Sequence, residues 1–198
     1  STNRLTGDTL AMMKKNLLIG LGLALIAPTL PAAEYKIDPT HSFVAFRIQH
    51  LGYSWMYGQF NDVSGSFSWD SKDPGASKVS VKVDPASVDT NHAERDKHLR
   101  SPDFLDTGKF PEASFTGAKY TGDENGGLLE GELSVHGVTL PVSVNVSRVG
   151  EGKDPWGGYR AGFEATYTMT RSDFRMDYNL GPGSEKMEIT ISLEGIRQ

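Results

Sequence analysis

The chain has 198 residues, enough for one domain with a substantial core, and its 22 glycines and 10 prolines are more turn residues than a helical bundle carries. The absence of cysteine excludes disulfides, thiolate zinc sites and a cysteine nucleophile. The formal net charge of −5 gives the chain no general attraction for nucleic acid or for anionic lipid surfaces.

The N-terminal segment has the three-part layout of a secretory signal peptide. A basic start at residues 12–15 precedes an apolar run at 17–27, and small residues follow before the polar chain begins. The apolar run is shorter than the roughly 20 residues that a membrane-spanning helix needs. We therefore expect export, cleavage near Ala32-Ala33 and no integral membrane segment after processing. The predicted organisation is an extraneous extension at residues 1–11, a signal peptide at 12–33 and a single β domain at 34–198.

From Glu34 onward, apolar and polar residues alternate over short runs. In "KVSVKV" at 78–83, Val79, Val81 and Val83 fall on one face and polar residues on the other. Such alternation predicts half-buried strands with one face toward the core. The same pattern predicts strands at 42–48, 65–69, 141–149, 161–169 and 186–195.

Turn signals separate these runs at Asp73-Pro74-Gly75, Asn125-Gly126-Gly127, His136-Gly137 and residues 154–158. Spacing this short leaves no room for the crossover helices that parallel strands require. We therefore predict an all-β domain of eight or nine mostly antiparallel strands, which fits a closed barrel or a sandwich.

The stretch "NHAERDKHLRSPDFLD" at 91–106 packs nine charged or histidine side chains into sixteen positions. We predict a short helix over residues 91–100, because positions 92–100 contain no Gly, Pro or β-branched residue. Thr90 and Asn91 can each cap this helix, and Glu94 stands three residues after Asn91 in a capping-box arrangement.

The same stretch could instead hold catalytic acids and bases. However, His92 and His98 are six residues apart and do not share a helix face, so they do not form the His-Glu-x-x-His zinc motif. The chain has no Gly-x-Ser-x-Gly elbow for a nucleophilic serine. Capping, ion pairing and packing therefore explain the stretch better than catalysis does.

Several long segments resemble the YceI family of bacterial periplasmic proteins. They are "KIDPTHSFVAFRIQHLG", "YGQFNDVSGSFSWD", "SVDTNHAERDKHLRSPDFLDTGKFPEASF", "LEGELSVHGVTLPV" and "AGFEATYTMTRSDF", in this order. The resemblance runs from about Tyr35 to Gly195. Leu105 departs from it, standing where a second Phe is common, and Arg175 stands where Gly often follows Asp-Phe.

This resemblance implies a lipocalin-like antiparallel β-barrel of about eight strands that holds a polyisoprenoid or a similar long apolar chain. It also implies a periplasmic location, a second copy of the chain as a partner in a homodimer, and no established catalytic activity. An eight-stranded barrel is wide enough either to be filled by its own side chains or to hold one small ligand. The expected function is a binding or carrier protein for an isoprenoid quinone or a polyprenyl phosphate, with no metal, no cofactor and no nucleic acid as a partner.

The residues expected to contact the ligand come from the strands, the aromatic run at 51–60 and the predicted helix. Arg95 and His98 are placed to meet a polar head group at the mouth of the barrel. The alternative is an enzyme acting on such a lipid, with His98 or His50 as general base. The full expected set is Phe43, Phe46, Ile48, His50, Tyr53, Trp55, Tyr57, Phe60, Phe67, Arg95, His98, Leu99, Phe104, Phe115 and Phe163.

Overall fold

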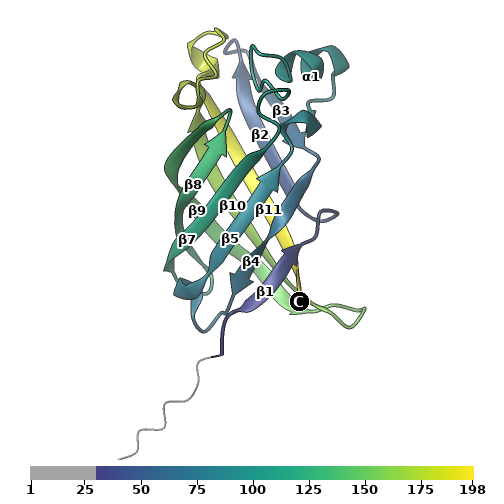
Figure 1. The fold of residues 1–198 in the computed structure, drawn as a ribbon, viewed down its shortest axis with the longest axis vertical. Helices are drawn as coiled ribbons and strands as arrows, with labels where there is room; N and C mark the ends of the chain where they lie inside the picture. The colour runs from purple at the N-terminus through teal and green to yellow at the C-terminus, as the bar shows by residue number, and fades with distance from the viewer. Residues whose placement is uncertain (1–29) are drawn as a thin grey trace, which may run out of the picture. The chain divides into compact units, whose positions relative to one another are not determined.

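The computed structural model describes residues 30–198, so the predictions made for residues 1–29 lie outside the described part of the chain. Residues 31–198 form one compact unit built around an antiparallel sheet (Figure 1). Its strands are β1 (Ala33–Ile37), β2 (Phe43–His50), β3 (Ser54–Phe60), β4 (Val63–Trp69), β5 (Lys78–Val83), β6 (Val88–Asp89), β7 (Ala113–Gly122), β8 (Gly126–Val135), β9 (Val138–Lys153), β10 (Tyr159–Thr170) and β11 (Lys186–Arg197).

The sheet closes into an eight-stranded barrel. Its strand order is β1-β4-β5-β7-β8-β9-β10-β11, and β11 pairs again with β1. Strands β2, β3 and β6 continue the paths of β1, β4 and β5 after short segments that are not strand. Strand β11 therefore pairs with β1 through Tyr35↔Arg197 and with β2 through Phe46↔Ile189. Every strand pairing is antiparallel, which confirms the predicted lipocalin-like barrel of about eight strands.

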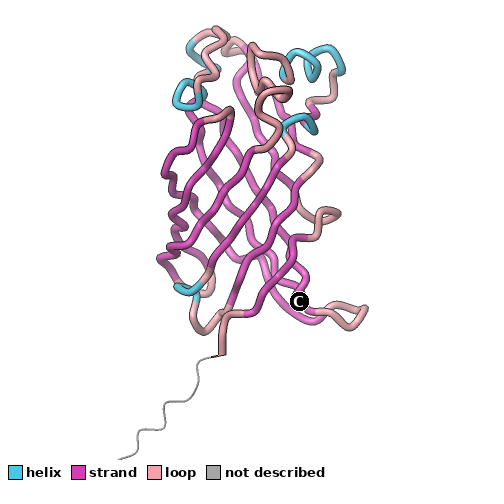
Figure 2. The backbone as a smooth tube through the Cα atoms, viewed as in Figure 1, coloured by secondary structure: helices cyan, strands magenta, loops and turns pink. Residues whose placement is uncertain are grey.

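The helical segments are short and lie in the loops at the ends of the barrel (Figure 2). Helix α1 and the segment after β10 lie at one end, whereas the β4–β5 connection lies at the other (Figure 1). These segments are η1 (Pro74–Ala76), η2 (Pro85–Ser87), α1 (Ala93–Leu99), η3 (Arg171–Phe174) and η4 (Pro182–Ser184).

Helix α1 lies within the predicted range, but the capping prediction is wrong. The N-cap is His92, whose Nδ1 accepts a hydrogen bond from the Arg95 amide at 3.2 Å. Asn91 has a left-handed φ of 62°, whereas an N-cap residue has an extended backbone. Glu94 is consequently one position too early in the helix to close a capping box with His92.

Two clusters of buried side chains occupy the barrel. One centres on β1 and β4 and contains Tyr35, Phe67 and Trp69. The other contains Met169, Phe174 and Met176, from β10 and the loop that follows it. The predicted alternation is confirmed in β5, β9, β10 and β11, where every second residue points to the interior of the barrel.

Candidate ligand cavity inside the barrel

A cavity of about 200 Å³ runs inside the barrel. Its wall is built from the inward positions of the alternating strands, as in β9, where Val142, Val144 and Val146 face inward. A cavity of this size with an aliphatic and aromatic lining stays dry and takes up apolar molecules. The lining residues are Val44, Phe60, Phe67, Ser68, Trp69, Ser77, Lys78, Val79, Val81, Val83, Pro85, Leu105, Ala113, Ser114, Phe115, Tyr120, Leu129, Leu133, Val135, Val142, Val144, Val146, Phe163, Ala165, Tyr167, Met169, Met176, Met187, Ile189, Ile191 and Leu193.

The wall offers no buried charge to a ligand. Lys78 is the one charged residue among those that line the cavity in the described chain, and its side chain is exposed. Burial raises the pKa of the Tyr167 phenol above its usual value, so this group is neutral at physiological pH. An apolar guest would therefore gain roughly 25 cal/mol for each Å² of apolar surface that it buries here.

Aromatic rings fill the end of the cavity near η1. Trp69 packs edge-on against Phe163 and Tyr120, with ring centroids 4.8 Å and 6.5 Å away. The Trp69 indole donates a hydrogen bond to Glu151, and the Tyr120 hydroxyl donates to the backbone oxygen of Asp123. The polar atoms of these two rings are therefore satisfied away from the cavity.

Arg171 fixes the segment that covers the opposite end of the barrel. Its buried guanidinium donates hydrogen bonds to the backbone oxygens of Ser184, Met176 and Tyr178, at 2.7, 2.9 and 3.1 Å. Burial lowers the pKa of Arg171 from its usual value. These bonds hold the loop after η3 in place, so that Met176 reaches the cavity wall.

Six of the predicted contact residues point to the interior. Phe60, Phe67, Phe115 and Phe163 line the cavity. Phe46 and Ile48 are buried on the same face of β2 as Val44, but they do not line the cavity. Phe46 packs instead against Phe60, with ring centroids 5.6 Å apart.

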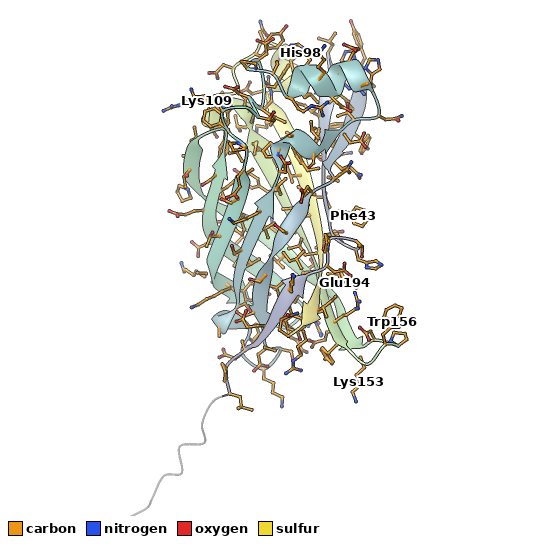
Figure 3. The ribbon with its side chains drawn as sticks, turned by 45° about the vertical axis from the view of Figure 1, so that its right-hand side comes forward. Phe43, His98, Lys109, Lys153, Trp156 and Glu194 are labelled. Atoms are coloured by element: carbon orange, nitrogen blue, oxygen red, sulfur yellow. The ribbon has the colours of Figure 1, made fainter. Side chains whose placement is uncertain are left out.

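The rest of the predicted aromatic run lies outside the cavity. Tyr53, Trp55 and Tyr57 are exposed, Tyr53 by 83%. Side chains of a strand alternate between faces, and Met56, Gly58 and Phe60 occupy the inward positions of β3. By the same alternation Phe43 projects from the outer side of the barrel, as Figure 3 shows. His50, at the end of β2, is also exposed.

The predicted head-group residues are held by structural contacts instead. Arg95 donates hydrogen bonds to the hydroxyl and the backbone oxygen of Thr90. His98, a residue of α1, pairs with Asp103 at 2.8 Å (Figure 3). His98 also packs edge-on against Phe104, which is buried. Like these residues, the half-buried Leu99 does not line the cavity.

Three methionines of the wall were absent from the predicted contact set. Met169 and Met187 lie on the inward faces that alternation had already identified in β10 and β11. Periodicity alone could therefore have added them. Met176 lies in a loop, where no periodic pattern exists, so the sequence carried no signal for it.

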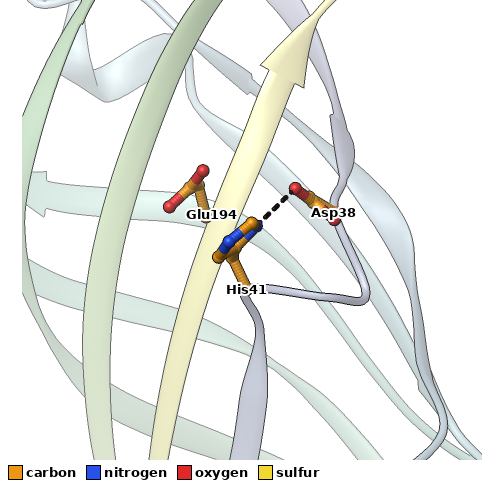
Figure 4. A group of neighbouring side chains, drawn as sticks. All are labelled: Asp38, His41 and Glu194. Carbon is orange, nitrogen blue, oxygen red and sulfur yellow. Dashed lines mark hydrogen bonds and ion pairs between the residues drawn. The ribbon is translucent and has the colours of Figure 1, made fainter. Parts of the chain in front are cut away.

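A cluster of ionisable groups lies on the outside of the barrel, away from the cavity. Asp38, His41 and Glu194 bring their ligand atoms within 4.8 Å of one another (Figure 4). The Arg160 guanidinium donates to Asp38 at 2.8 Å and to Glu194 at 2.6 Å. Hydrogen bonds from His41, Thr40 and Arg160 hold the pKa of Asp38 well below its usual range. Because the positively charged guanidinium already hydrogen-bonds both carboxylates, the arrangement suits an ion-pair network better than a metal ion.

The YceI-like domain model matches residues 35–195. This chain belongs to the YceI family. The chain is 51% identical over 191 residues to a UPF0312 protein of Pseudomonas paraeruginosa and, over the same length, to protein YceI of Escherichia coli. Each of these matches covers 94% of this chain and 100% of the relative.

Solved structures share the barrel. A Campylobacter jejuni YceI protein is 29% identical, with a TM-score of 0.68, and the match covers 76% of this chain and 90% of that one. Burkholderia cenocepacia BcnA is 19% identical, with a TM-score of 0.70, covering 80% and 98%. A polyisoprenoid binding domain from Saccharophagus degradans is 18% identical, with a TM-score of 0.62, covering 84% and 99%. Within the described residues, no helix has the length and apolar character needed to cross a membrane.

Proposed function

We propose that this protein binds a long-chain isoprenoid lipid, such as an isoprenoid quinone or a polyprenyl phosphate, inside the barrel and carries it through the periplasm. The observation that carries the proposal is the apolar cavity, whose wall exposes aliphatic and aromatic side chains along its length. The polyisoprenoid binding domain with the same fold supports this choice of ligand. The signal-peptide pattern at residues 12–33 supports export.

Binding explains the site better than catalysis does. His98 and His50, the candidate general bases, are exposed and do not line the cavity. A general base has to come within about 2.6–3.2 Å of the proton that it removes. A lipid enclosed in the barrel is therefore out of reach of both imidazoles.

The direct test is to purify the processed protein from periplasm and to measure bound lipid by native mass spectrometry and organic extraction. We expect an isoprenoid lipid bound to the protein. Phe163→Lys should empty the barrel, because an unpaired charge in the apolar wall is costly. The matched control is Glu164→Lys, one position along β10 on its exposed face. Wild-type protein that is free of lipid would contradict the proposal.

The variant His98→Ala distinguishes the carrier hypothesis from the enzyme hypothesis. Because His98 lies outside the cavity, we expect this variant to hold the same lipid, in the same amount and chemical form, as the wild type. Lipid that is chemically altered by the wild type but not by His98→Ala would establish catalysis instead.

A further inference from the structure

Leu51 occupies a turn position that disfavours a leucine. The Tyr53 amide donates a hydrogen bond to the backbone oxygen of His50 at 2.9 Å and closes the turn between β2 and β3. Leu51 and Gly52 both have positive φ in this turn, 51° and 77°. Hairpin turns of this kind favour Asn-Gly or Asp-Gly, and positive φ strains most other residues. The Leu51 side chain is nevertheless 57% exposed, so burial in the barrel does not explain the leucine.

The surface beside this turn is aromatic and uncharged. Tyr53, Trp55 and Tyr57 follow Leu51 in the chain, and all three are exposed. Residues 48–61 contain no Asp, Glu, Lys or Arg, although these residue types make up 23% of the whole chain. Contiguous exposed apolar groups mark surfaces that bind proteins or membranes. The turn and the start of β3 therefore have the composition of a binding surface.

A second uncharged segment adjoins the turn. Residues 178–184 belong to the loop whose Met176 reaches the cavity wall, and they also contain no charged residue. The Ser184 hydroxyl donates a hydrogen bond to the backbone oxygen of Gln49, just before the turn. Tyr178 is exposed on the same loop. The two segments therefore form one uncharged surface, at the end of the barrel that carries α1 (Figure 1).

We propose that this surface docks on a bilayer of zwitterionic lipids, with the side chains of Leu51 and Tyr53 in the headgroup region. The proposal rests on the proposed function, because a carrier has to meet the membrane that holds its lipid. Tyrosine and tryptophan favour this region, where the ring is apolar and its polar atom stays hydrated. Insertion of a few side chains gives weak and reversible binding, so the carrier can leave the membrane again.

Charge and shape favour a bilayer over other partners. The formal net charge of −5 disfavours anionic lipids, and the nearest charge on β2, Arg47, is already paired with Glu188 at 2.7 Å. A stable contact between two copies of the chain buries about 800 Å² of each copy and needs a self-complementary face. A projecting turn has no such face, whereas a fluid bilayer adapts to its shape.

The test is flotation of the processed protein with phosphatidylcholine vesicles. Leu51→Asn preserves the turn, because Asn favours positive φ, but it removes the apolar side chain. If docking buries about 60 Å² of Leu51 surface, the variant should bind the vesicles about tenfold more weakly than the wild type. Val149→Asn is the matched control and should float like the wild type, because Val149 is exposed near Lys153, at the opposite end of the barrel (Figure 3). High salt should not release the wild type, since no ion pair drives the binding.

The melting temperature of Leu51→Asn should equal or exceed that of the wild type, because Asn relieves the strain of a positive φ. A lower melting temperature would make Leu51 a structural residue and overturn the proposal. Equal flotation of wild type and Leu51→Asn, or release of the wild type by salt, would also overturn it. So would a change from dimer to monomer when Leu51→Asn is sedimented, since the turn would then be a contact between copies.

The docking proposal and the proposed function fail in different ways. Wild-type protein that carries an isoprenoid lipid from the periplasm but does not float with vesicles would overturn the docking proposal alone. Wild-type protein that floats but contains no lipid when it is purified from the periplasm would overturn the proposed function alone.

Discussion

Arg175 follows η3 with a left-handed φ of 57°, a conformation that costs non-glycine residues about 1–2 kcal/mol. Glycine often occupies this position in the sequences that the chain resembles. The Arg175 side chain is exposed and makes no hydrogen bond or ion pair within the described residues. We therefore expect Arg175→Gly to raise the free energy of unfolding by about 1 kcal/mol in a urea titration. Thr168→Gly, in the extended β10, should instead lower it by about 0.5–1 kcal/mol.

Asp38 makes the stability of the barrel depend on pH. Its folded-state pKa lies below the value of about 3.9 that an aspartate has in an unfolded chain. Its stabilising contribution is therefore complete above about pH 4–5 and is lost as the pH falls through the folded-state pKa. We expect Asp38→Asn to lower the free energy of unfolding by about 1–3 kcal/mol at pH 7, because a neutral amide replaces the charged acceptor of the Arg160 guanidinium.

The difference between Asp38→Asn and the wild type should shrink as the pH is lowered from about 4 toward 2, since the aspartate of the unfolded chain becomes protonated in this range while the folded-state carboxylate stays ionised. Unfolding followed by circular dichroism at several pH values measures this difference. Asp73→Asn is the control, because the Asp73 side chain is exposed and caps nothing. A difference that stays constant across this range would show that the Asp38 charge is not the source of the stabilisation.

At the scale of elements, a buried carboxylate helps to attach α1 to the barrel. Asp96 accepts hydrogen bonds from both the amide and the hydroxyl of Thr90, which directly follows β6. Asp96→Ala leaves both donors without an acceptor, and we expect it to lower the free energy of unfolding by about 1–3 kcal/mol. Glu94→Ala, on the exposed face of the same helix, should change it by less than about 0.5 kcal/mol. Equal effects of the two substitutions would contradict this role for Asp96.

The strands could be predicted from the sequence because each carries a period-two pattern. Val142, Val144 and Val146 in β9 show it without interruption, and all three reach the cavity wall. The turn at His136-Gly137 could also be predicted from the sequence. Both residues adopt positive φ, 53° and 73°, in the tight turn between β8 and β9.

The residues that line the cavity were harder to predict, because alternation defines two faces without saying which one is inside. Residues 57 and 60 of one strand cannot share a face, yet Tyr57 and Phe60 were both expected in the cavity. Aromatic character favoured the run as a whole, whereas the pairing of β3 with β2 decides its orientation. Met176 depends on the bonds that Arg171 makes to loop carbonyls, which no local pattern reports.

At the scale of the whole molecule, the barrel combines a packed core with an internal cavity. The cluster around Tyr35 and Phe67 and the cluster around Met169 and Phe174 stabilise the fold at separate places, and the cavity wall includes members of both. Filling the cavity should therefore remove the ligand without removing the fold. Ala165 is suited to this experiment because it is the smallest side chain that β10 contributes to the cavity wall, between Phe163 and Tyr167.

We expect Ala165→Phe to place a ring in the space that the lipid would occupy. If the ring displaces about 60 Å² of buried lipid surface, the loss of roughly 1.5 kcal/mol corresponds to about tenfold weaker binding. The empty variant should remain folded with a melting temperature near that of the wild type, because the added ring enters existing space. Thr166→Phe, one position along on the exposed face, is the matched control and should bind lipid normally. Unchanged lipid content in folded Ala165→Phe, measured by native mass spectrometry, would mean that the ligand binds elsewhere than in this cavity.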